Sequence, residues 1–292
     1  MERPVLVSHR QPPIRYIVRY SACDPCASSR NLGGETMLKG IDHIVIVVPD
    51  LERAVRSYAA LGFTVVLGGK HPIGTENALI GFSDGAYLEL LVFLVPDSPH
   101  PWFAALASGG GLVDFCMQID DLRSEMALFA RAGVELAEPM RLTRERPDGY
   151  RLSWVLSFPP VDRSGALPFL ISDETPREER VPREVAHPNG VTGIEALTVA
   201  VRDASELRKI YTRVCGNVAR DLRRDDLAGA GFAVRFGPHG VELLSPASST
   251  GPLADRLRAR GPGPYAVRLR TRGGTPGPLD QARTLGVPLT LV

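Results

Sequence analysis

Residues 42–51 read DHIVIVVPDL, and this stretch decides the fold. Its β-branched run predicts a buried strand that ends at Pro49. Asp50 is a helix-capping residue type, and apolar residues then recur at helical spacing until Gly62, which predicts the end of the helix. The stretch therefore predicts a strand that leads directly into an amphipathic helix.

Three more strands are expected after this helix. The apolar runs that predict them are residues 63–67, 78–82 and 86–93, and the last run follows a turn at residues 83–85. The first part of the chain is thus predicted to form a β-α-β-β-β unit.

The same unit returns further along the chain. Twelve residues separate Asp50 from Gly62, and twelve also separate Asp121 from Gly133. A third unit is expected to open with the strand 194–201. A shortened fourth unit is expected over residues 266–287, with helical apolar positions near residues 279–282. The body of the protein is therefore predicted to be an internal repeat.

Composition suggests how these units are grouped. Residues 1–36 hold few apolar residues, so we expect disorder there, and we hypothesise that translation starts at Met37. Residues 37–173 are expected to form a first domain of two βαβββ modules. Residues 174–190, rich in Pro, Glu and Arg, are the expected linker. Residues 191–292 are expected to form a second, degenerate half with one module and a truncated one.

Charge and hydropathy exclude two classes of partner. The chain has 34 Lys and Arg against 33 Asp and Glu, a net charge of +1, which argues against nucleic-acid binding. Its longest apolar stretch, 88–95, contains Glu89 and is too short to cross a bilayer. We therefore expect a soluble cytoplasmic protein.

Two polar residues interrupt predicted strand faces that are otherwise apolar. Because side chains alternate along a strand, His43 shares a face with apolar residues, and Glu89 does the same on a later strand. Burying either group alone is costly, and a metal ion would satisfy both. The alternatives are that His43 hydrogen-bonds within the sheet and that Glu89 pairs with Arg56 or Arg151.

Residues 42–51 resemble the opening strand of the vicinal oxygen chelate superfamily, which includes glyoxalases, extradiol dioxygenases and bleomycin-type resistance proteins. The resemblance to the glyoxalase-like branch is closer. It is carried by His71-Pro72, Gly74-Thr75, Asn77 and Tyr87-Leu88-Glu89, and in the second unit by Asp114, Trp154 and Leu167-Pro168-Phe169-Leu170-Ile171. It covers residues 38–173 well and 191–245 loosely.

The resemblance implies an α+β fold of repeated βαβββ modules. Their mixed β-sheets would form cupped, half-open barrels with helices packed outside, around a divalent metal ion. His43 and Glu89 are then the expected ligands, and Asp114, which matches His43 when the two helix caps are superposed, is the expected third. The last strand of the second unit would supply a fourth ligand, but it offers Phe169, Leu170 and Ile171 and no acid until Asp173, so the fourth position is either open to substrate or the site is inactive. Zinc, iron, manganese and nickel all suit a His/carboxylate set.

A group of polar residues is expected at the rim of the cup. His71, Thr75 and Asn77 would contact the substrate there, although the same residues are also typical of a turn. Trp154 and Phe169 would form an apolar wall for a small organic ligand, with core packing as the alternative role.

Two functions of different classes follow from these residues. The first is a metal-dependent isomerase or lyase that acts on a small oxygenated or carbonyl compound, with Glu89 or His71 moving the proton. The alternative is a metal-free protein that binds or sequesters a small molecule. A dioxygenase ranks lower, because the second histidine that such iron sites use is missing. A homodimer is compatible with the truncated fourth unit, which leaves an edge strand.

Overall fold

A computed structural model of the chain describes residues 38–216 and 219–292. The expectations for residues 1–36 and for a start at Met37 concern residues outside these ranges. All described residues belong to one compact unit, Glu35–Val292.

The first predicted module is confirmed. Asp50 caps its helix by accepting a hydrogen bond from the Arg53 amide at 2.9 Å. The elements are β1 Gly40–Val47, α1 Leu51–Ala60, β2 Val66–His71, β3 Thr75–Gly81 and β4 Tyr87–Phe93. The run 63–67 is the least accurate of the strand predictions, because β2 begins at Val66 and extends to His71.

The second module repeats this order with an added 3₁₀ helix in front of it. Asp121 caps its helix through the Ser124 amide at 2.9 Å, as Asp50 does in the first module. The elements are η1 Pro101–Ser108, β5 Gly111–Gln118, α2 Leu122–Arg131, β6 Met140–Glu145, β7 Arg151–Ser157, η2 Val161–Arg163 and β8 Phe169–Asp173.

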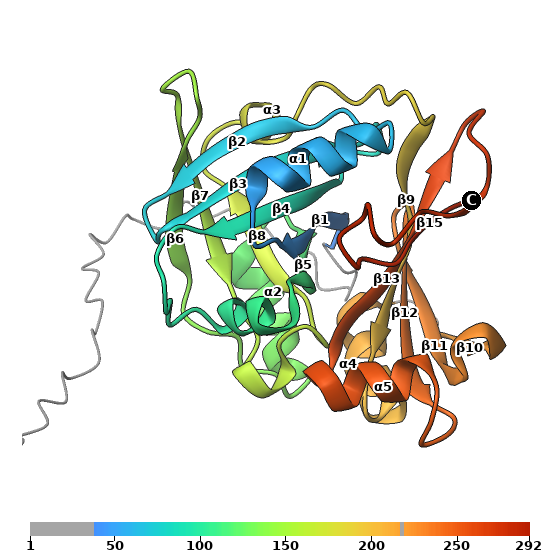
Figure 1. Cartoon of the computed structure of the whole chain (residues 1–292). Helices are drawn as coiled ribbons and strands as arrows, with labels where there is room; N and C mark the ends of the chain where they lie inside the picture. Colours follow the sequence, from blue (N-terminus) through green and yellow to red (C-terminus); the bar gives the residue numbers. More distant parts are fainter. Residues whose placement is uncertain (1–37, 217–218) are drawn as a thin grey trace, which may run out of the picture. The chain divides into compact units, whose positions relative to one another are not determined.

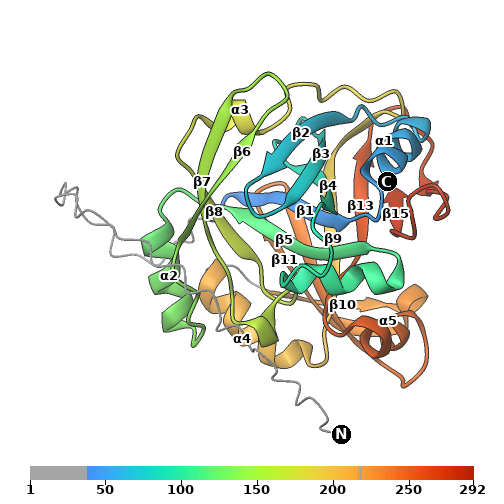
Figure 2. The same cartoon turned by 60° about the vertical axis from the view of Figure 1, so that its left-hand side comes forward.

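The two modules close into one eight-stranded barrel rather than a half-open cup, with the strand order β1-β4-β3-β2-β6-β7-β8-β5. Two seams join the modules. At one, β1 pairs with β5 over most of its length, and at the other β2 meets β6 through a single pair, Lys70 and Glu145. Closure leaves neither module with a free sheet edge. Figures 1 and 2 show the barrel strands with α1 and α2 outside them.

Apolar residues pack on both faces of the barrel wall. The outer face packs against α1 and α2, for example through Tyr58 and Phe129. A separate apolar cluster fills much of the interior, and it consists of Val45, Val47, Leu91, Cys116, Leu152, Trp154, Leu156, Phe169 and Ile171. The polar residues described below are therefore held in a largely apolar surrounding.

The rest of the chain forms an open seven-stranded sheet, ordered β10-β11-β12-β9-β13-β15-β14. The third module is confirmed by β9 Val191–Ala200, α4 Ala204–Cys215, β10 Arg220–Arg224, η3 Asp225–Leu227, β11 Gly229–Phe236 and β12 His239–Pro246. The remaining elements are α5 Pro252–Arg260, β13 Gly263–Thr271, β14 Gly277–Pro278 and β15 Leu289–Leu291.

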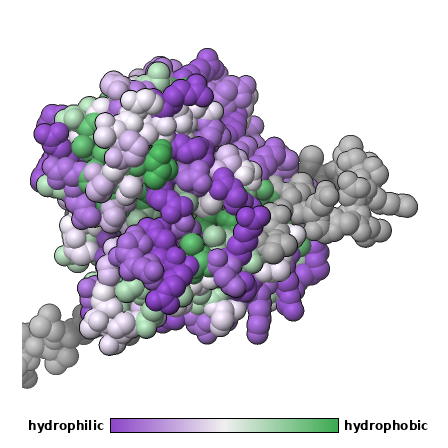
Figure 3. Space-filling model, turned by 90° about the vertical axis from the view of Figure 1, so that its right-hand side faces the viewer, coloured by the Kyte–Doolittle hydropathy of each residue, from purple (hydrophilic) through white to green (hydrophobic). Residues whose placement is uncertain are grey.

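The shortened fourth unit has its strand but lacks the expected helix. β13 contains the predicted run 266–269, whereas residues 279–282 belong to an irregular segment that ends in turns. Two apolar residues at helical spacing, Leu279 and Ala282, are too few to start a helix in a segment of this length. Figure 3 looks onto the side where β10, β11 and β15 lie and shows a mostly polar surface.

The expected linker packs closely against the barrel. It contains the short helix α3 Arg177–Arg180, and further along His187 accepts a hydrogen bond from the Thr64 amide at 3.0 Å. Arg180 is only 2% exposed. No helix within the described residues is long and apolar enough to span a membrane.

Candidate functional site

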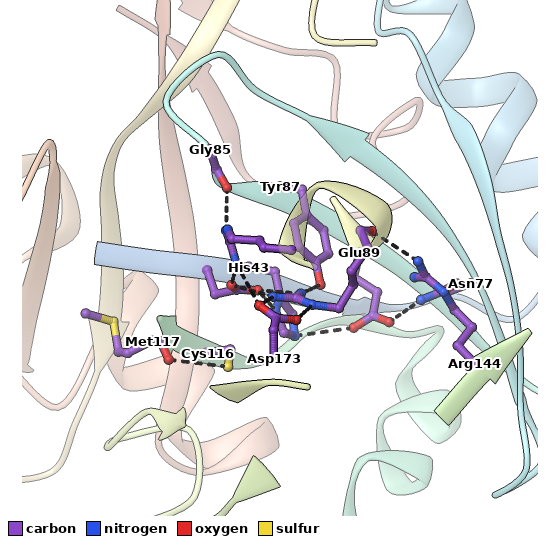
Figure 4. Close-up of polar contacts among 12 residues, drawn as sticks. His43, Asn77, Gly85, Tyr87, Glu89, Cys116, Met117, Arg144 and Asp173 are labelled. Atoms are coloured by element: carbon purple, nitrogen blue, oxygen red, sulfur yellow. Dashed lines mark hydrogen bonds and ion pairs between the residues drawn. The ribbon is translucent and has the colours of Figure 1, made fainter. Parts of the chain in front are cut away.

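A histidine and a glutamate face each other inside the barrel. β1 and β4 are parallel neighbours, with His43 opposite Tyr87 and Val45 opposite Glu89. The two side chains come from adjacent strands, and His43 Nε2 lies 3.7 Å from Glu89 Oε2. His43 is 5% exposed and Glu89 7% exposed. Figure 4 shows the two side chains facing each other. The structure thus brings together two of the three predicted metal ligands.

Asp42 determines that the Nδ1 atom of the His43 ring carries a proton. His43 Nδ1 lies 2.7 Å from Asp42 Oδ1. Burial alone would raise the pKa of Asp42, but ion pairs with Arg180 and Arg177 outweigh it and hold this pKa well below its usual range. An ionised Asp42 can only accept a hydrogen bond, so His43 donates its Nδ1 proton to Asp42. The other ring nitrogen, Nε2, faces Glu89.

Arg180 connects the segment after the barrel to this pair. Its guanidinium binds Asp42 at 2.9 Å, Asp173 at 2.5 Å and the Tyr87 hydroxyl at 2.8 Å. Tyr87 in turn stacks on the His43 ring, with centroids 4.8 Å apart. Sequence reasoning missed Arg180, because no local pattern distinguishes it from the other arginines of an exposed-looking segment.

Asn77 and Arg144 extend the polar network on the other side of Glu89. Asn77 Nδ2 donates to Glu89 Oε1 at 2.6 Å, and Arg144 Nη2 donates to the Arg180 carbonyl at 3.1 Å. Both side chains are buried, and both retain a polar atom without a hydrogen-bond partner, Asn77 Oδ1 and Arg144 Nε. Asn77 was predicted as a substrate contact. Arg144 was missed, although strand alternation on β6 could have placed it inward.

Neither alternative partner of Glu89 is used. Arg56 pairs with Glu52 on the helix surface, and Arg151 lies 3.4 Å from Glu145. Both arginines are largely exposed. The interpretation that Glu89 pairs with one of them is therefore wrong.

His71 and Thr75 lie next to each other in the barrel rather than on an open rim. His71 ends β2, Thr75 begins β3, and His71 Nδ1 lies 2.9 Å from Thr75 Oγ1. Burial lowers the pKa of His71 to about 4, against the opposing charge of Glu89. The ring meets Trp154 edge-on, with centroids 6.0 Å apart. His71 is therefore a neutral imidazole at neutral pH.

Asp114 is buried but has other partners. Its carboxylate accepts hydrogen bonds from Trp102 Nε1 at 3.1 Å and Ser164 Oγ at 3.0 Å. Burial raises its pKa to about 7 despite these donors. Cys116, and not Asp114, pairs with His43 across β1 and β5. Within residues 38–216 and 219–292, no three His, Cys, Asp or Glu side chains are grouped as a metal site would require.

The predicted aromatic wall lies beside the histidine. Phe169 meets the His43 ring edge-on at 5.4 Å and stacks on Phe158 at 4.9 Å between centroids. Trp102 also packs against Phe169. Phe169 and Trp154 both belong to the interior apolar cluster. Each therefore packs in the core and also lies beside the polar network.

The open sheet contains an internal counterpart of Glu89. Glu242 is 4% exposed and pairs with Arg268 at 2.7 Å and Arg224 at 3.0 Å. Ala196 occupies the position that His43 has in the first module, and it lies across from Gly240 on the neighbouring strand. Glu242 is thus balanced by arginines, whereas Glu89 faces an imidazole.

Comparisons with known proteins follow the fold. A family model described as a glyoxalase-like domain matches residues 41–215. A hypothetical protein from Staphylococcus aureus superposes with a TM-score of 0.64 at 14% identity, covering 87% of this chain and 98% of that one. A mutant 4-hydroxymandelate synthase from Streptomyces coelicolor gives 0.54 at 18% identity, covering 85% and 74%. A search of curated protein sequences finds no match.

Proposed function

The chain belongs to the glyoxalase-like domain family within the vicinal oxygen chelate superfamily, and from this premise we propose that it is a divalent-metal-dependent enzyme. Its substrate would be a small oxygenated or carbonyl compound, and its reaction an isomerisation or a lyase reaction. One observation carries the proposal: His43 Nε2 and the Glu89 carboxylate face each other across 3.7 Å.

A cation between these two atoms would satisfy both of them. A shared proton is a poor solution, because 3.7 Å exceeds the 2.7–3.2 Å of an N–H···O hydrogen bond. Two ligands about 2.1 Å from one tetrahedral ion are roughly 3.4 Å apart, which is close to the observed separation. The donor pair therefore fits zinc, iron, manganese or nickel.

The surroundings of the pair also suit a metal site. Histidines that bind metals usually donate their second N–H to a carboxylate, which fixes the ring and raises its basicity, and Asp42 occupies this position. Asn77 holds the other oxygen of Glu89. Asp114 is left out of the proposed ligand set because Trp102 and Ser164 already bind its carboxylate. Two protein ligands leave room for water and substrate oxygens.

Each residue then has a separate task. A bound divalent ion would act as a Lewis acid that stabilises negative charge developing on a substrate oxygen. Asp42 is a positioning residue that keeps the proton of His43 on Nδ1. Glu89 is the proposed proton carrier, with Asn77 orienting its carboxylate. His71, whose pKa is about 4, is a weak base that accepts a proton only transiently.

The second candidate is a metal-free binding protein for a small aromatic or oxygenated compound. It is favoured by the aromatic residues around Phe169 and by a donor pair that is one ligand short of a usual catalytic site. Oxygenation ranks below both, because the second histidine that such iron sites use is missing from the predicted ligand set.

Metal content separates the two candidates. Wild-type protein, His43→Ala, Glu89→Gln and Glu242→Gln are purified from medium supplemented with zinc, iron, manganese and nickel, and metals are measured by mass spectrometry. Glu242→Gln is the matched control, because it removes an equally buried carboxylate that faces no histidine. We expect about one ion per chain in wild type and Glu242→Gln and almost none in the other two. Equally negligible metal in all four would favour the binding protein.

A further inference from the structure

The open sheet carries a cleft that the proposed metal site does not use. Its volume is about 410 Å³, which is within the usual range for small-molecule sites. It is lined by residues of β9, β10, β11, β12 and β13, and none of them belongs to the barrel. The charged side chains among them are Arg220, Arg235, Arg268, Glu195 and Glu242.

The floor of the cleft differs from the barrel at one matching pair of positions. In the barrel, His43 lies opposite Tyr87, and the two rings stack with their centroids 4.8 Å apart. In the open sheet, Ala196 and Gly240 lie opposite each other at the same two positions. A Cβ atom built on Gly240 would lie 3.3 Å from the Ala196 Cβ atom, so both positions face the same space. The loss of two rings therefore leaves room for a planar group.

Two arginines flank this floor. Arg235 pairs with Gly240 across β11 and β12, and Arg268 pairs with Ala196 across β13 and β9. The order across four neighbouring strands is therefore arginine, glycine, alanine, arginine. Neighbouring strands lie about 4.8 Å apart, so the two outer strands are about 14 Å apart, which is a width that suits one small aromatic ring between two side chains.

The charges at the cleft leave one cation without a carboxylate. Glu242 binds Arg268 at 2.7 Å, and Glu195 binds Arg235 at 3.1 Å. Each glutamate also binds a second arginine outside the lining, but each of those arginines binds an aspartate as well. Within residues 38–216 and 219–292, no carboxylate forms an ion pair with Arg220. The lining, with three arginines and two glutamates, therefore has a surplus positive charge at Arg220.

The cleft is open to solvent and rests on a fixed polar group. Arg220 is exposed and the Arg268 side chain is 30% exposed, whereas Glu242 is only 4% exposed. Thr198 Oγ1 donates a hydrogen bond to Glu242 at 2.9 Å, and Glu242 in turn holds the Arg268 guanidinium. A donor that is already held in place loses less conformational entropy when it binds a ligand.

We propose that this cleft is a second small-molecule site and that it binds a small aromatic carboxylate. The ring lies over Ala196 and Gly240, between the guanidinium groups of Arg235 and Arg268, which can stack on it. The carboxylate accepts charge-assisted hydrogen bonds from Arg220. Binding requires neither a metal ion nor any residue of the barrel, so this inference is independent of the proposed function.

The test compares an acid with its neutral amide. Fluorine NMR titrations measure the binding of 4-fluorobenzoate and 4-fluorobenzamide to the wild-type protein. We expect the acid to bind at least about fivefold more tightly than the amide, and its affinity to fall as sodium chloride is added. Equal binding of the two probes, or no detectable binding of the acid, would overturn the proposal.

Arg220→Gln removes the surplus charge without breaking an ion pair, because Arg220 is exposed and pairs with no described carboxylate. It should weaken binding of the acid at least about fivefold and change binding of the amide less than about twofold. Arg223→Gln is the matched control, since Arg223 lies on the same strand, is 72% exposed and does not line the cleft. Equal losses in the two variants would contradict the assignment to this cleft.

Ala233→Leu tests the space in the cleft. Ala233 lines it opposite Glu242, at the position where the barrel has Leu79. The larger side chain should weaken binding of both probes at least about fivefold, because it occupies space that the ring needs. His43→Ala should bind the acid as the wild type does. If His43→Ala loses binding while Ala233→Leu and Arg220→Gln keep it, the acid binds in the barrel and the proposal is wrong.

Discussion

Arg180 and Asp42 form a buried two-point ion pair, although they are 138 residues apart in the chain. Nη1 and Oδ1 are 2.9 Å apart, and so are Nη2 and Oδ2. The segment that follows the barrel thereby holds in place the carboxylate that orients His43. This contact links the stability of the fold to the proposed metal pair.

Loss of Arg180 should destabilise the protein strongly. Arg180→Ala leaves the buried carboxylate of Asp42 and the partly buried carboxylate of Asp173 without this partner, so we expect the free energy of unfolding to fall by about 3–5 kcal/mol. Arg183→Ala in the same segment removes an arginine whose side chain is 69% exposed and should cost less than about 0.5 kcal/mol. Urea unfolding measures both. If Arg180→Ala and Arg183→Ala lose similar amounts of stability, the Arg180–Asp42 ion pair contributes little.

Asp42→Asn should weaken metal binding more than stability alone explains. The neutral amide no longer holds the His43 proton on Nδ1 as a carboxylate does, and metal affinity should fall about 10- to 100-fold. Asp173→Asn is the matched control, because Asp173 also binds Arg180 but does not contact His43. Competition with a chromophoric chelator measures the affinities. The positioning role of Asp42 is rejected if both variants lose affinity equally.

Asp114 should make the stability of the protein depend on pH. Burial raises its pKa to about 7, so the folded protein keeps a proton that the unfolded chain has released above about pH 4. Stability should therefore fall as pH rises from about 4 to 7, by up to about 1.4 kcal/mol per pH unit. Asp114→Asn should lack this contribution. The free energy of unfolding of wild type and Asp114→Asn is measured by denaturation between about pH 4 and 7. If the two proteins lose stability in parallel over this range, the predicted role of Asp114 is contradicted.

His71 should change the stability of the protein with pH in the opposite direction to Asp114, over an overlapping pH range. Its pKa is about 4 in the folded protein and near 6.5 in the unfolded chain, so the unfolded chain binds its proton first as pH falls. The stability that this difference provides is present above about pH 6.5 and is lost as pH falls toward 4. An NMR titration of the His71 ring should have its midpoint near 4. A midpoint near 6.5 would mean that the ring is solvated.

Much of the fold could be predicted from local patterns. The capping aspartates Asp50 and Asp121, each followed by a glycine twelve residues later, marked two copies of one module. Strand alternation placed His43 and Glu89 on inward faces, and the parallel pairing of β1 with β4 brings them together. These features depend on residues close in sequence, or on a pairing that the module itself dictates.

The remaining features depend on contacts between distant residues. The match of Asp114 with His43 agrees with the β1–β5 pairing, in which His43 lies opposite Cys116 and Val45 opposite Asp114. The Asp114 carboxylate is nevertheless bound by Trp102 and Ser164, which lie in segments that the module pattern does not specify. Closure of the barrel requires the β2–β6 seam, which no single module specifies. The buried role of Arg180 arises only when Asp42 lies beside it, so the composition of residues 174–190 suggested a linker instead.

The location of a bound ion tests the central claim most directly. Crystals of the wild-type protein soaked in manganese or zinc are measured at wavelengths that give anomalous scattering from the metal. The account predicts one anomalous peak in contact with both His43 Nε2 and Glu89 Oε2, with Asp42 still hydrogen-bonded to Nδ1. A peak at other residues, or a direct hydrogen bond between His43 and Glu89 with no peak, would contradict it.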